Sequence, residues 1–344
     1  MYFKRLRISV GILLLNLIFW IFCLIFGSWL IVIFSTLLFL INIAQFAMFL
    51  YNYFTMMAGD WENLTDTSAL NLKIEKVLIP MADEVQLSGL FIRLKHSATS
   101  SEQKKQKLPL VIMHHGLLGN KERFFGLSQP IAATGYAVLL VDARGHGETR
   151  KNYPAFHADD WYITKTTGIF PDFHYILKYA ISRPEVDPSR ITVIGTSMGG
   201  GLALSQGIKD PRISLIIALS PYFSWKNFEN DPESHRWFTE PWMTRLFINI
   251  QVNAKKITSF DRLISPEAIF TPKIVKEHRE KIRVVFARND KVLLYSAHFL
   301  PLQARLKLSP EHVLVLNKGD HYLRGQETIV ASQIISWLNE KFEN

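Results

Sequence analysis

Residues 191–204 read Ile191-Thr-Val-Ile-Gly-Thr-Ser-Met-Gly-Gly-Gly-Leu-Ala-Leu204. Four apolar or β-branched residues precede Gly195, and small residues typical of a tightly packed helix follow Gly199. The pattern predicts a short buried strand, a very tight turn and a helix. Glycine at both positions removes the Cβ atoms that would clash in so sharp a bend. Ser197 then stands at the tip of the turn, beside helix N–H groups that can stabilise a negative charge.

Short apolar stretches alternate with helical patterns on both sides of this turn. Strands are predicted at 73–80, 85–94, 108–114, 136–141, 191–194, 213–219, 282–287 and 312–316. Helices are predicted at 129–134, 171–182 and 329–342. The first two strands form a hairpin around residues 81–84. Alternating strands and helices favour an α/β fold, with a mostly parallel sheet flanked by helices on both faces.

Residues 221–281 interrupt this alternation, because they show no strand pattern and are rich in aromatic residues. The aromatic residues are Tyr222, Phe223, Trp225, Phe228, Trp237, Phe238, Trp242 and Phe247. We interpret the segment as a helical cap insertion over the carboxyl ends of the strands, the edge where open α/β sheets bind ligands. The alternative is that the rings only pack the insertion onto the core.

Ser197, Asp290 and His321 each come shortly after a predicted strand. Because the carboxyl ends of parallel strands meet at one edge of a sheet, we expect these three side chains to lie close together. A serine hydroxyl becomes a good nucleophile when a neighbouring base removes its proton. The chain order Ser, Asp, His is one of the known orders of a serine triad. Glu229 and Asp231, which follow the preceding strand, stay open as alternatives for the acid.

Two further motifs accompany the Ser197 turn, His115–Gly119 (HGLLG) and Asp142–Gly147 (DARGHG). From about residue 73 to its end, the chain resembles a serine hydrolase of the α/β-hydrolase superfamily. In the esterase, lipase and peptidase-like branches of that superfamily, the motifs HG-x-x-G, D-x-RGHG and G-x-S-x-G recur in this order. The resemblance implies an α/β-hydrolase fold, in which residues 221–281 are the cap insertion predicted above.

The resemblance also implies acyl transfer through a covalent intermediate. Ser197 is then the nucleophile, His321 the base and later the acid, and Asp290 the carboxylate that orients the imidazole. The backbone N–H groups of Leu117 and Met198 form the expected oxyanion hole. Four further polar residues resemble family positions that shape turns: His115, Asp142, Arg144 and His146.

The first 57 residues differ in composition from the rest of the chain. No charged residue occurs from Ile8 to Gly59, and the only charges before that stretch are Lys4, Arg5 and Arg7. One crossing of a bilayer needs about 20 apolar residues, so the stretch is long enough for two. We therefore predict a membrane anchor over 1–57.

The anchor is predicted to contain two transmembrane helices near 8–26 and 29–50, separated by Gly27-Ser28. The basic residues at the N-terminus favour a cytoplasmic start, and two crossings return the chain to the cytoplasm. A single crossing would place everything after residue 60 on the opposite side. With two crossings, a linker over 58–72 leads to a cytoplasmic hydrolase domain over 73–344, with the cap at about 221–281.

Composition limits the other classes of function. The chain has 39 Lys plus Arg, 30 Asp plus Glu and one cysteine, Cys23, so it cannot form an intrachain disulfide. It shows no basic helix or interleaved aromatic and basic residues, and no nucleic-acid partner is expected. Its histidines and carboxylates lack metal-ligand spacing, and no metal and no cofactor are expected.

We therefore predict a membrane-anchored serine hydrolase that cleaves a carboxylic ester, with an acyl lipid or another apolar ester as substrate. A carboxylesterase or lipase is favoured over a peptidase. The alternatives on the same fold are a serine peptidase or amidase, a thioesterase and an acyltransferase. The alternative from a different class is a catalytically inactive, membrane-tethered binding protein.

Overall fold

The structure of the chain is a computed structural model. It describes residues 14–57 except 16, 24 and 26, together with 71–95, 107–230 and 254–343. The chain divides into two compact units, one built on residues 1–58 with 239–250, and one on 59–238 with 251–344. Each unit is described by itself.

The described part of the first unit is helical. Residues 14–15, 17–23 and 25 form helical turns, and α2 (Trp29–Met57) follows them. The Trp20 indole N–H donates a hydrogen bond of 2.8 Å to the Thr36 hydroxyl, and the Trp20 ring stacks on Phe39 with 5.2 Å between ring centroids. These contacts hold the first helical turns against α2.

Among the described residues, no helix is both long enough and apolar enough to cross a membrane. The finding contradicts the predicted localisation, a two-helix membrane protein with a cytoplasmic catalytic domain. The prediction depended on the absence of charge over 8–59, and that absence does not by itself establish a spanning helix.

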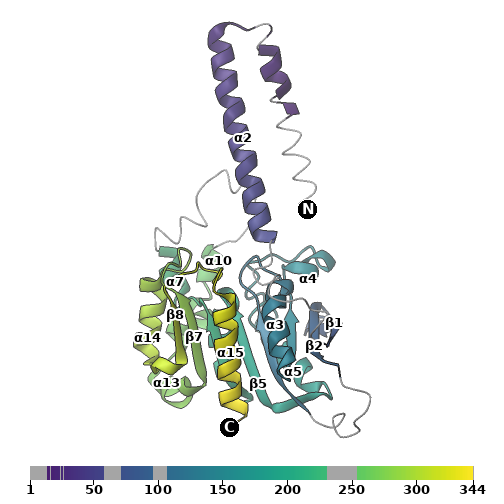
Figure 1. The fold of residues 1–344 in the computed structure, drawn as a ribbon, viewed down its shortest axis with the longest axis vertical. Helices are drawn as coiled ribbons and strands as arrows, with labels where there is room; N and C mark the ends of the chain where they lie inside the picture. Colours follow the sequence, from purple (N-terminus) through teal and green to yellow (C-terminus); the bar gives the residue numbers. More distant parts are fainter. Residues whose placement is uncertain are drawn as a thin grey trace. The chain divides into compact units, whose positions relative to one another are not determined.

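An eight-stranded sheet forms the centre of the second unit (Figure 1). The strands are β1 (Leu72–Pro80), β2 (Gln86–Leu94), β3 (Leu108–His114), β4 (Ala137–Val141), β5 (Val186–Thr196), β6 (Ile213–Leu219), β7 (Ile282–Ala287) and β8 (Val313–Leu316). Their order in the sheet is β1-β2-β4-β3-β5-β6-β7-β8. The pairs β1–β2 and β2–β4 are antiparallel, and all the other pairs are parallel.

Helices and short helical turns connect the strands. The α-helices of this unit are α3 (Phe125–Ala133), α4 (Gly147–Asn152), α5 (Asp172–Ser182), α6 (Met198–Gln206), α7 (Trp225–Asn230), α10 (Ala254–Thr258), α11 (Asp261–Ile264), α12 (Pro266–Ile269), α13 (Pro272–His278), α14 (Leu300–Leu306) and α15 (Glu327–Phe342). The shorter turns are η2 (Lys121–Phe124), η3 (Gly207–Lys209), η4 (Arg279–Lys281), η5 (Tyr295–Phe299) and η6 (Pro310–His312).

Alternate residues of the central strands point into two separate hydrophobic cores. In β3, Leu110 and Ile112 pack with residues of α5, α6 and α14, whereas Val111 and Met113 pack with residues of α3 and α15. Figure 1 shows α3 and α15 on the same face of the sheet. Both faces are therefore covered, which is why these strands read as continuous apolar runs instead of alternating patterns.

The structure confirms the predicted α/β fold with a mostly parallel sheet. The hairpin at 73–94, the strands 108–114, 213–219 and 282–287 and the closing helix lie within two residues of their predicted bounds. The strand before Ser197 is longer than predicted, because it begins at Val186. The patterns did not indicate α4 and α14, which are short.

The described part of 221–281 consists of α7, α10, α11, α12, α13 and η4, with no strand among its described residues. Tyr222, Phe223, Trp225 and Phe228 are buried in the same core as the sheet residues of that face. The other aromatic residues of the predicted cap, Trp237, Phe238, Trp242 and Phe247, lie outside the described residues.

Candidate active site

The turn at Ser197 has an unusual backbone conformation. β5 ends at Thr196 and α6 begins at Met198, so a single residue separates the strand from the helix. Ser197 has φ 53° and ψ −115°, a combination that side-chain-bearing residues rarely adopt. Its N–H donates to the Leu219 carbonyl of the neighbouring strand at 2.9 Å, and its carbonyl accepts from the Gly201 N–H at 2.9 Å. Both ends of the turn are thus fixed by hydrogen bonds.

The glycines on either side of Ser197 are required by space. A Cβ on Gly195 would collide with the Gly199 carbonyl, and a Cβ on Gly199 would collide with the His114 carbonyl of β3. The backbone of α6 therefore packs directly against the backbones of β5 and β3. This close packing leaves the half-exposed Ser197 side chain at the carboxyl edge of the sheet.

Asp290 and His321 meet at the same edge. Asp290 follows β7, His321 follows β8, and both side chains are at most 5% exposed. The imidazole Nδ1 lies 2.8 Å from Asp290 Oδ2. The other carboxylate oxygen, Oδ1, accepts hydrogen bonds of 2.8 Å from the N–H groups of Val292 and Leu293. A carboxylate held in this way orients the ring with Nδ1–H toward Asp290 and Nε2 free to accept a proton.

Ser197 and His321 are not joined by a hydrogen bond among the described residues. They follow β5 and β8, which are separated in the sheet by β6 and β7. In unliganded enzymes the contact between nucleophile and base is often long and shortens when substrate binds. The alternative acids cannot be compared with Asp290, because the Glu229 side chain and Asp231 lie outside the described residues.

The loop after β3 runs directly past the Ser197 turn. A Cβ on Gly116 would lie 3.1 Å from the Cβ of Ser197, so the backbone there approaches the serine closely. The Gly119 N–H closes the loop on the Gly116 carbonyl at 3.0 Å, and Leu118 adopts a positive φ of 62°. Leu117, the predicted oxyanion residue, lies between these fixed points.

The N–H groups of Leu117 and Met198 remain available in this arrangement. Among the described residues, neither N–H group donates a hydrogen bond outside regular helices and strands. Met198 is the first residue of α6, so its N–H has no partner within the helix. Two such donors beside a serine can stabilise an oxyanion.

His115 fixes the loop through its side chain. Its Nδ1–H donates to the Gly116 carbonyl at 2.8 Å, and its Nε2 accepts from the Ala143 N–H at 3.1 Å. Burial lowers the pKa of His115 to about 3, so the ring is neutral and can serve as donor and acceptor at once. The role is structural, as the sequence analysis expected of this residue.

The motif at 142–147 is a buried ionic turn. Asp142 accepts from the N–H and the ammonium of Lys121 at 2.7 Å each, and from the Glu148 N–H at 2.8 Å. Arg144 is fully buried and donates to Asp172 at 2.6 Å and to Asp83 at 2.7 Å. Burial raises the pKa of Asp172 to about 6, although Arg144 opposes the shift. These ion pairs tie the turn to η2, to α5 and to the 81–84 hairpin.

The sequence analysis missed the contacts of Tyr322. Its ring lies edge-on to His321, with 5.2 Å between ring centroids. The guanidinium groups of Arg123 and Arg324 lie over the Tyr322 ring at 5.1 and 5.0 Å. Arg123 follows the Gly116–Gly119 loop, so this stack connects that loop to the histidine. Its only sequence signal was that Tyr322 adjoins His321.

Among the described residues, no group of three or more His, Cys, Asp or Glu is placed to hold a metal ion.

The fold and this arrangement together define an α/β-hydrolase. Solved structures show the same fold: the acetyl xylan esterase from Paenibacillus sp. R4 matches with a TM-score of 0.56 and 19% identity, over 81% of this chain and 87% of that one. The Pyrococcus furiosus esterase PF2001 matches with a TM-score of 0.57 and 18% identity, over 80% of this chain and 94% of that one.

A family model identifies the class more closely. The model described as "Serine aminopeptidase, S33" matches residues 105–296, and the chain belongs to this family of serine hydrolases. The alpha/beta hydrolase ucsC from Acremonium sp. is 30% identical over 181 residues, which are 49% of this chain and 35% of that protein. The matched region thus spans only about a third of that relative's length.

Proposed function

We propose that this protein hydrolyses a carboxylic ester through a covalent acyl-enzyme, with Ser197 as nucleophile, His321 as base and Asp290 as orienting carboxylate. The observation that carries the proposal is the buried Asp290–His321 contact of 2.8 Å. It lies at the sheet edge to which the strained Ser197 turn also belongs. A neutral imidazole oriented by a carboxylate is the group that a serine nucleophile requires.

The proposed reaction proceeds in two acyl transfers. His321 Nε2 takes the Ser197 hydroxyl proton while Oγ attacks the ester carbonyl carbon, and the N–H groups of Leu117 and Met198 stabilise the oxyanion. The C–O bond to the alcohol then breaks, and His321 returns the proton to the leaving alcohol. Water, deprotonated by the same imidazole, attacks the acyl-enzyme and releases a carboxylic acid and free Ser197.

The substrate is proposed only at the level of a carboxylic ester. The acyl-lipid prediction rested on a membrane anchor and on an aromatic cap that admits an acyl chain. The described residues contain no spanning helix, and the described rings are packed into the core. Both solved structures with the same fold are esterases, which supports ester chemistry in general.

The covalent step has a direct test. A fluorophosphonate probe should label the full chain once, at Ser197, and the Ser197→Ala variant should remain unlabelled. Peptide mass spectrometry locates the adduct. If the folded wild type is not labelled, or if Ser197→Ala is labelled equally, the proposed nucleophile is wrong and the inactive binding protein becomes the better interpretation.

Amide hydrolysis is the second candidate, because the matching family model is described as a serine aminopeptidase. The two reactions are separated by one acyl group on two leaving groups, p-nitrophenyl butyrate and butyryl p-nitroanilide. If the protein is an esterase, kcat/KM should be higher for the ester than for the anilide. The ratio of the two kcat/KM values should exceed the ratio of the spontaneous hydrolysis rates of the two substrates. An aminopeptidase would instead favour p-nitroanilides of amino acids with a free amine.

A further inference from the structure

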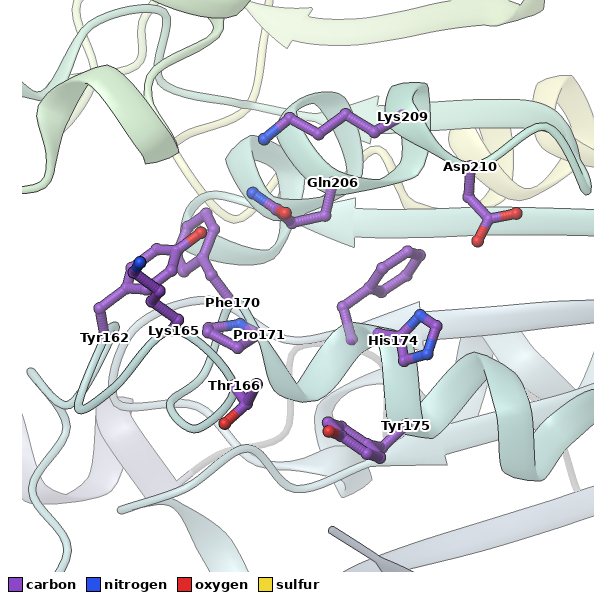
Figure 2. A pocket seen from close by; sticks show the side chains of 11 residues that line it. Tyr162, Lys165, Thr166, Phe170, Pro171, His174, Tyr175, Gln206, Lys209 and Asp210 are labelled. Atoms are coloured by element: carbon purple, nitrogen blue, oxygen red, sulfur yellow. The ribbon is translucent and has the colours of Figure 1, made fainter. Parts of the chain in front are cut away.

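A pocket lies beside α6, away from the Ser197 turn (Figure 2). Its volume is about 350 Å³, and three segments line it: residues 162–171, the first turn of α5, and the end of α6 with η3. Because α6 runs from Met198 to Gln206, its far end lies about 12 Å along the helix axis from the Ser197 turn. The pocket is therefore separate from the candidate active site.

Two buried phenylalanine rings form part of the pocket wall. They belong to Phe170 and Phe173, which are 0% and 3% exposed. Tyr162 and Tyr175 add half-buried aromatic rings, and Figure 2 shows the two tyrosines on different sides of the opening. Such rings exclude water from a flat or hydrocarbon group of a ligand.

The rim carries two lysines without counter-charge. In the described part of the chain, neither Lys165 nor Lys209 has an ion-pair or hydrogen-bond partner. Partial burial lowers the pKa of Lys209, and no carboxylate offsets this effect. Figure 2 shows the Lys209 side chain extending past Gln206, on the same side of the pocket as Lys165 and Tyr162. The two ammonium groups give this side of the pocket a positive charge.

The one carboxylate of the lining does not neutralise these lysines. Asp210 is held by Arg212 in two hydrogen bonds of 2.8 and 2.6 Å. Those hydrogen bonds lower the pKa of Asp210, which stays ionised and paired with the arginine. The net charge available to a ligand is therefore positive.

We propose that this pocket is a second binding site, which takes a small carboxylate with an aromatic or apolar body. The carboxylate lies between Lys165 and Lys209, and the body packs against Phe170 and Phe173. Gln206 lines the same side, and its Nε2 already donates to the Leu263 carbonyl at 3.2 Å and to the Ser205 hydroxyl at 3.3 Å. The inference goes beyond ester hydrolysis and does not depend on it.

Isothermal titration calorimetry with 4-phenylbutyrate tests the proposal on the full chain. The Lys165→Gln/Lys209→Gln double variant removes both charges, and Lys276→Gln removes an exposed lysine of α13 outside the pocket. We expect binding to the wild type and to Lys276→Gln with equal Kd, and at least about tenfold weaker binding to the double variant. Both pocket lysines are exposed enough for their substitution to leave the fold intact, which circular dichroism verifies.

Two further probes complete the design: one lacks the negative charge of the ligand, and the other lacks its apolar body. The matched amide, 4-phenylbutyramide, should bind at least about tenfold more weakly than the acid, and inorganic phosphate should bind more weakly than the acid as well. Equal binding of acid and amide would overturn the role of the lysines. Phosphate that binds as tightly as the acid would overturn the role of the two phenylalanine rings. Equal affinity of wild type and double variant would place the ligand elsewhere, for example as a product analogue near Ser197, and would overturn the site.

Discussion

Ser197 is held in place by its backbone and not by its side chain. A non-glycine residue at φ 53° and ψ −115° carries strain of about 1–3 kcal/mol, which the surrounding packing has to offset. The hydrogen bonds to Leu219 and Gly201 supply that restraint, and the Gly116 backbone passes close to the turn. The hydroxyl is therefore positioned before any substrate arrives.

At Asp290, the proposed role is to hold one tautomer of His321. Substituting Asp290→Asn should lower kcat for p-nitrophenyl butyrate by roughly 10⁴, as loss of the orienting carboxylate does in other serine triads, while KM changes little. Asp320→Asn is the matched control, because Asp320 adjoins His321 but is 45% exposed and pairs with Arg324. A kcat for Asp290→Asn within tenfold of wild type would disprove the assignment.

At Arg144, a buried charge joins two carboxylates. Arg144→Met should destabilise the fold by about 3–5 kcal/mol, because it leaves Asp172 buried without its cation. Urea unfolding at pH 8 measures the loss. Arg279→Met removes an exposed pair with Glu280 and should cost less than about 1 kcal/mol. Equal losses in the two variants would show that the buried ion pair contributes nothing special.

The element that defines the candidate site is the β5–α6 turn. Its geometry depends on close approaches between backbone atoms that leave no room for a side chain. These approaches are between Gly195 and Gly199 and between Gly199 and His114. α6 therefore packs unusually close to β5 and β3. This closeness brings the first N–H of the helix next to the serine.

Adding one methyl group should break this turn. Gly195→Ala places a Cβ on the Gly199 carbonyl, which has no room to move, so we expect a loss of at least about 3 kcal/mol of unfolding free energy and of fluorophosphonate labelling. Gly207→Ala is the matched control. Gly207 has a helical φ of −60°, and a Cβ there would meet only Ile216 at 3.5 Å, so this variant should gain about 0.4–1 kcal/mol. Thermal unfolding of both variants decides the point.

The helices after β6 show how one pattern can be read in two ways. Their aromatic residues predict a cap over the ligand-binding edge of the sheet, with packing of the rings onto the core as the alternative. The ring of Trp225 contacts Trp161, Tyr222 and Phe228 at 4.8, 6.0 and 4.9 Å between centroids. For the described rings, packing onto the core is what the structure shows.

On the scale of the whole molecule, three buried neutral histidines make stability depend on pH. Burial lowers the pKa of His114 to about 4, and the pKa values of His115 and His146 to about 3. Each takes up its proton near pH 6.5 when the chain is unfolded, so the unfolded state binds more protons in acid. Their contribution is complete above about pH 6.5 and is lost as pH falls toward 4 to 3. The pKa of Asp172 is raised to about 6, so this residue stabilises the folded state as pH falls and opposes the histidines. It is one group against three.

Unfolding free energies from urea titrations should therefore decrease between pH 7.5 and pH 5. His114→Leu should reduce the slope by up to about 1.4 kcal/mol per pH unit, because it removes one of the three groups. Its Nε2 is buried and has no hydrogen-bond partner among the described residues, so the substitution leaves no donor unpaired there. A stability that is flat or rising toward pH 5 would contradict the account.

The sequence by itself determined the order and type of the main elements. Continuous apolar runs such as 108–114 and 213–219 fold as strands wherever both faces of a sheet are covered, and glycines mark the turn at Ser197 because nothing larger fits. The same local logic placed Ser197, Asp290 and His321 after strands. It gave no reliable inference from the uncharged stretch 8–59, because lack of charge does not by itself define a spanning helix.

Only the tertiary structure decided which distant groups meet. The Asp290–His321 contact, the pairing of Arg144 with Asp83 and Asp172, and the approach of Gly116 to Ser197 join residues far apart in the chain. The pocket beside α6 likewise combines a loop, α5 and η3. Spacing along a sequence reports the neighbours within one element, whereas these contacts depend on the order of the strands and on how closely the helices pack.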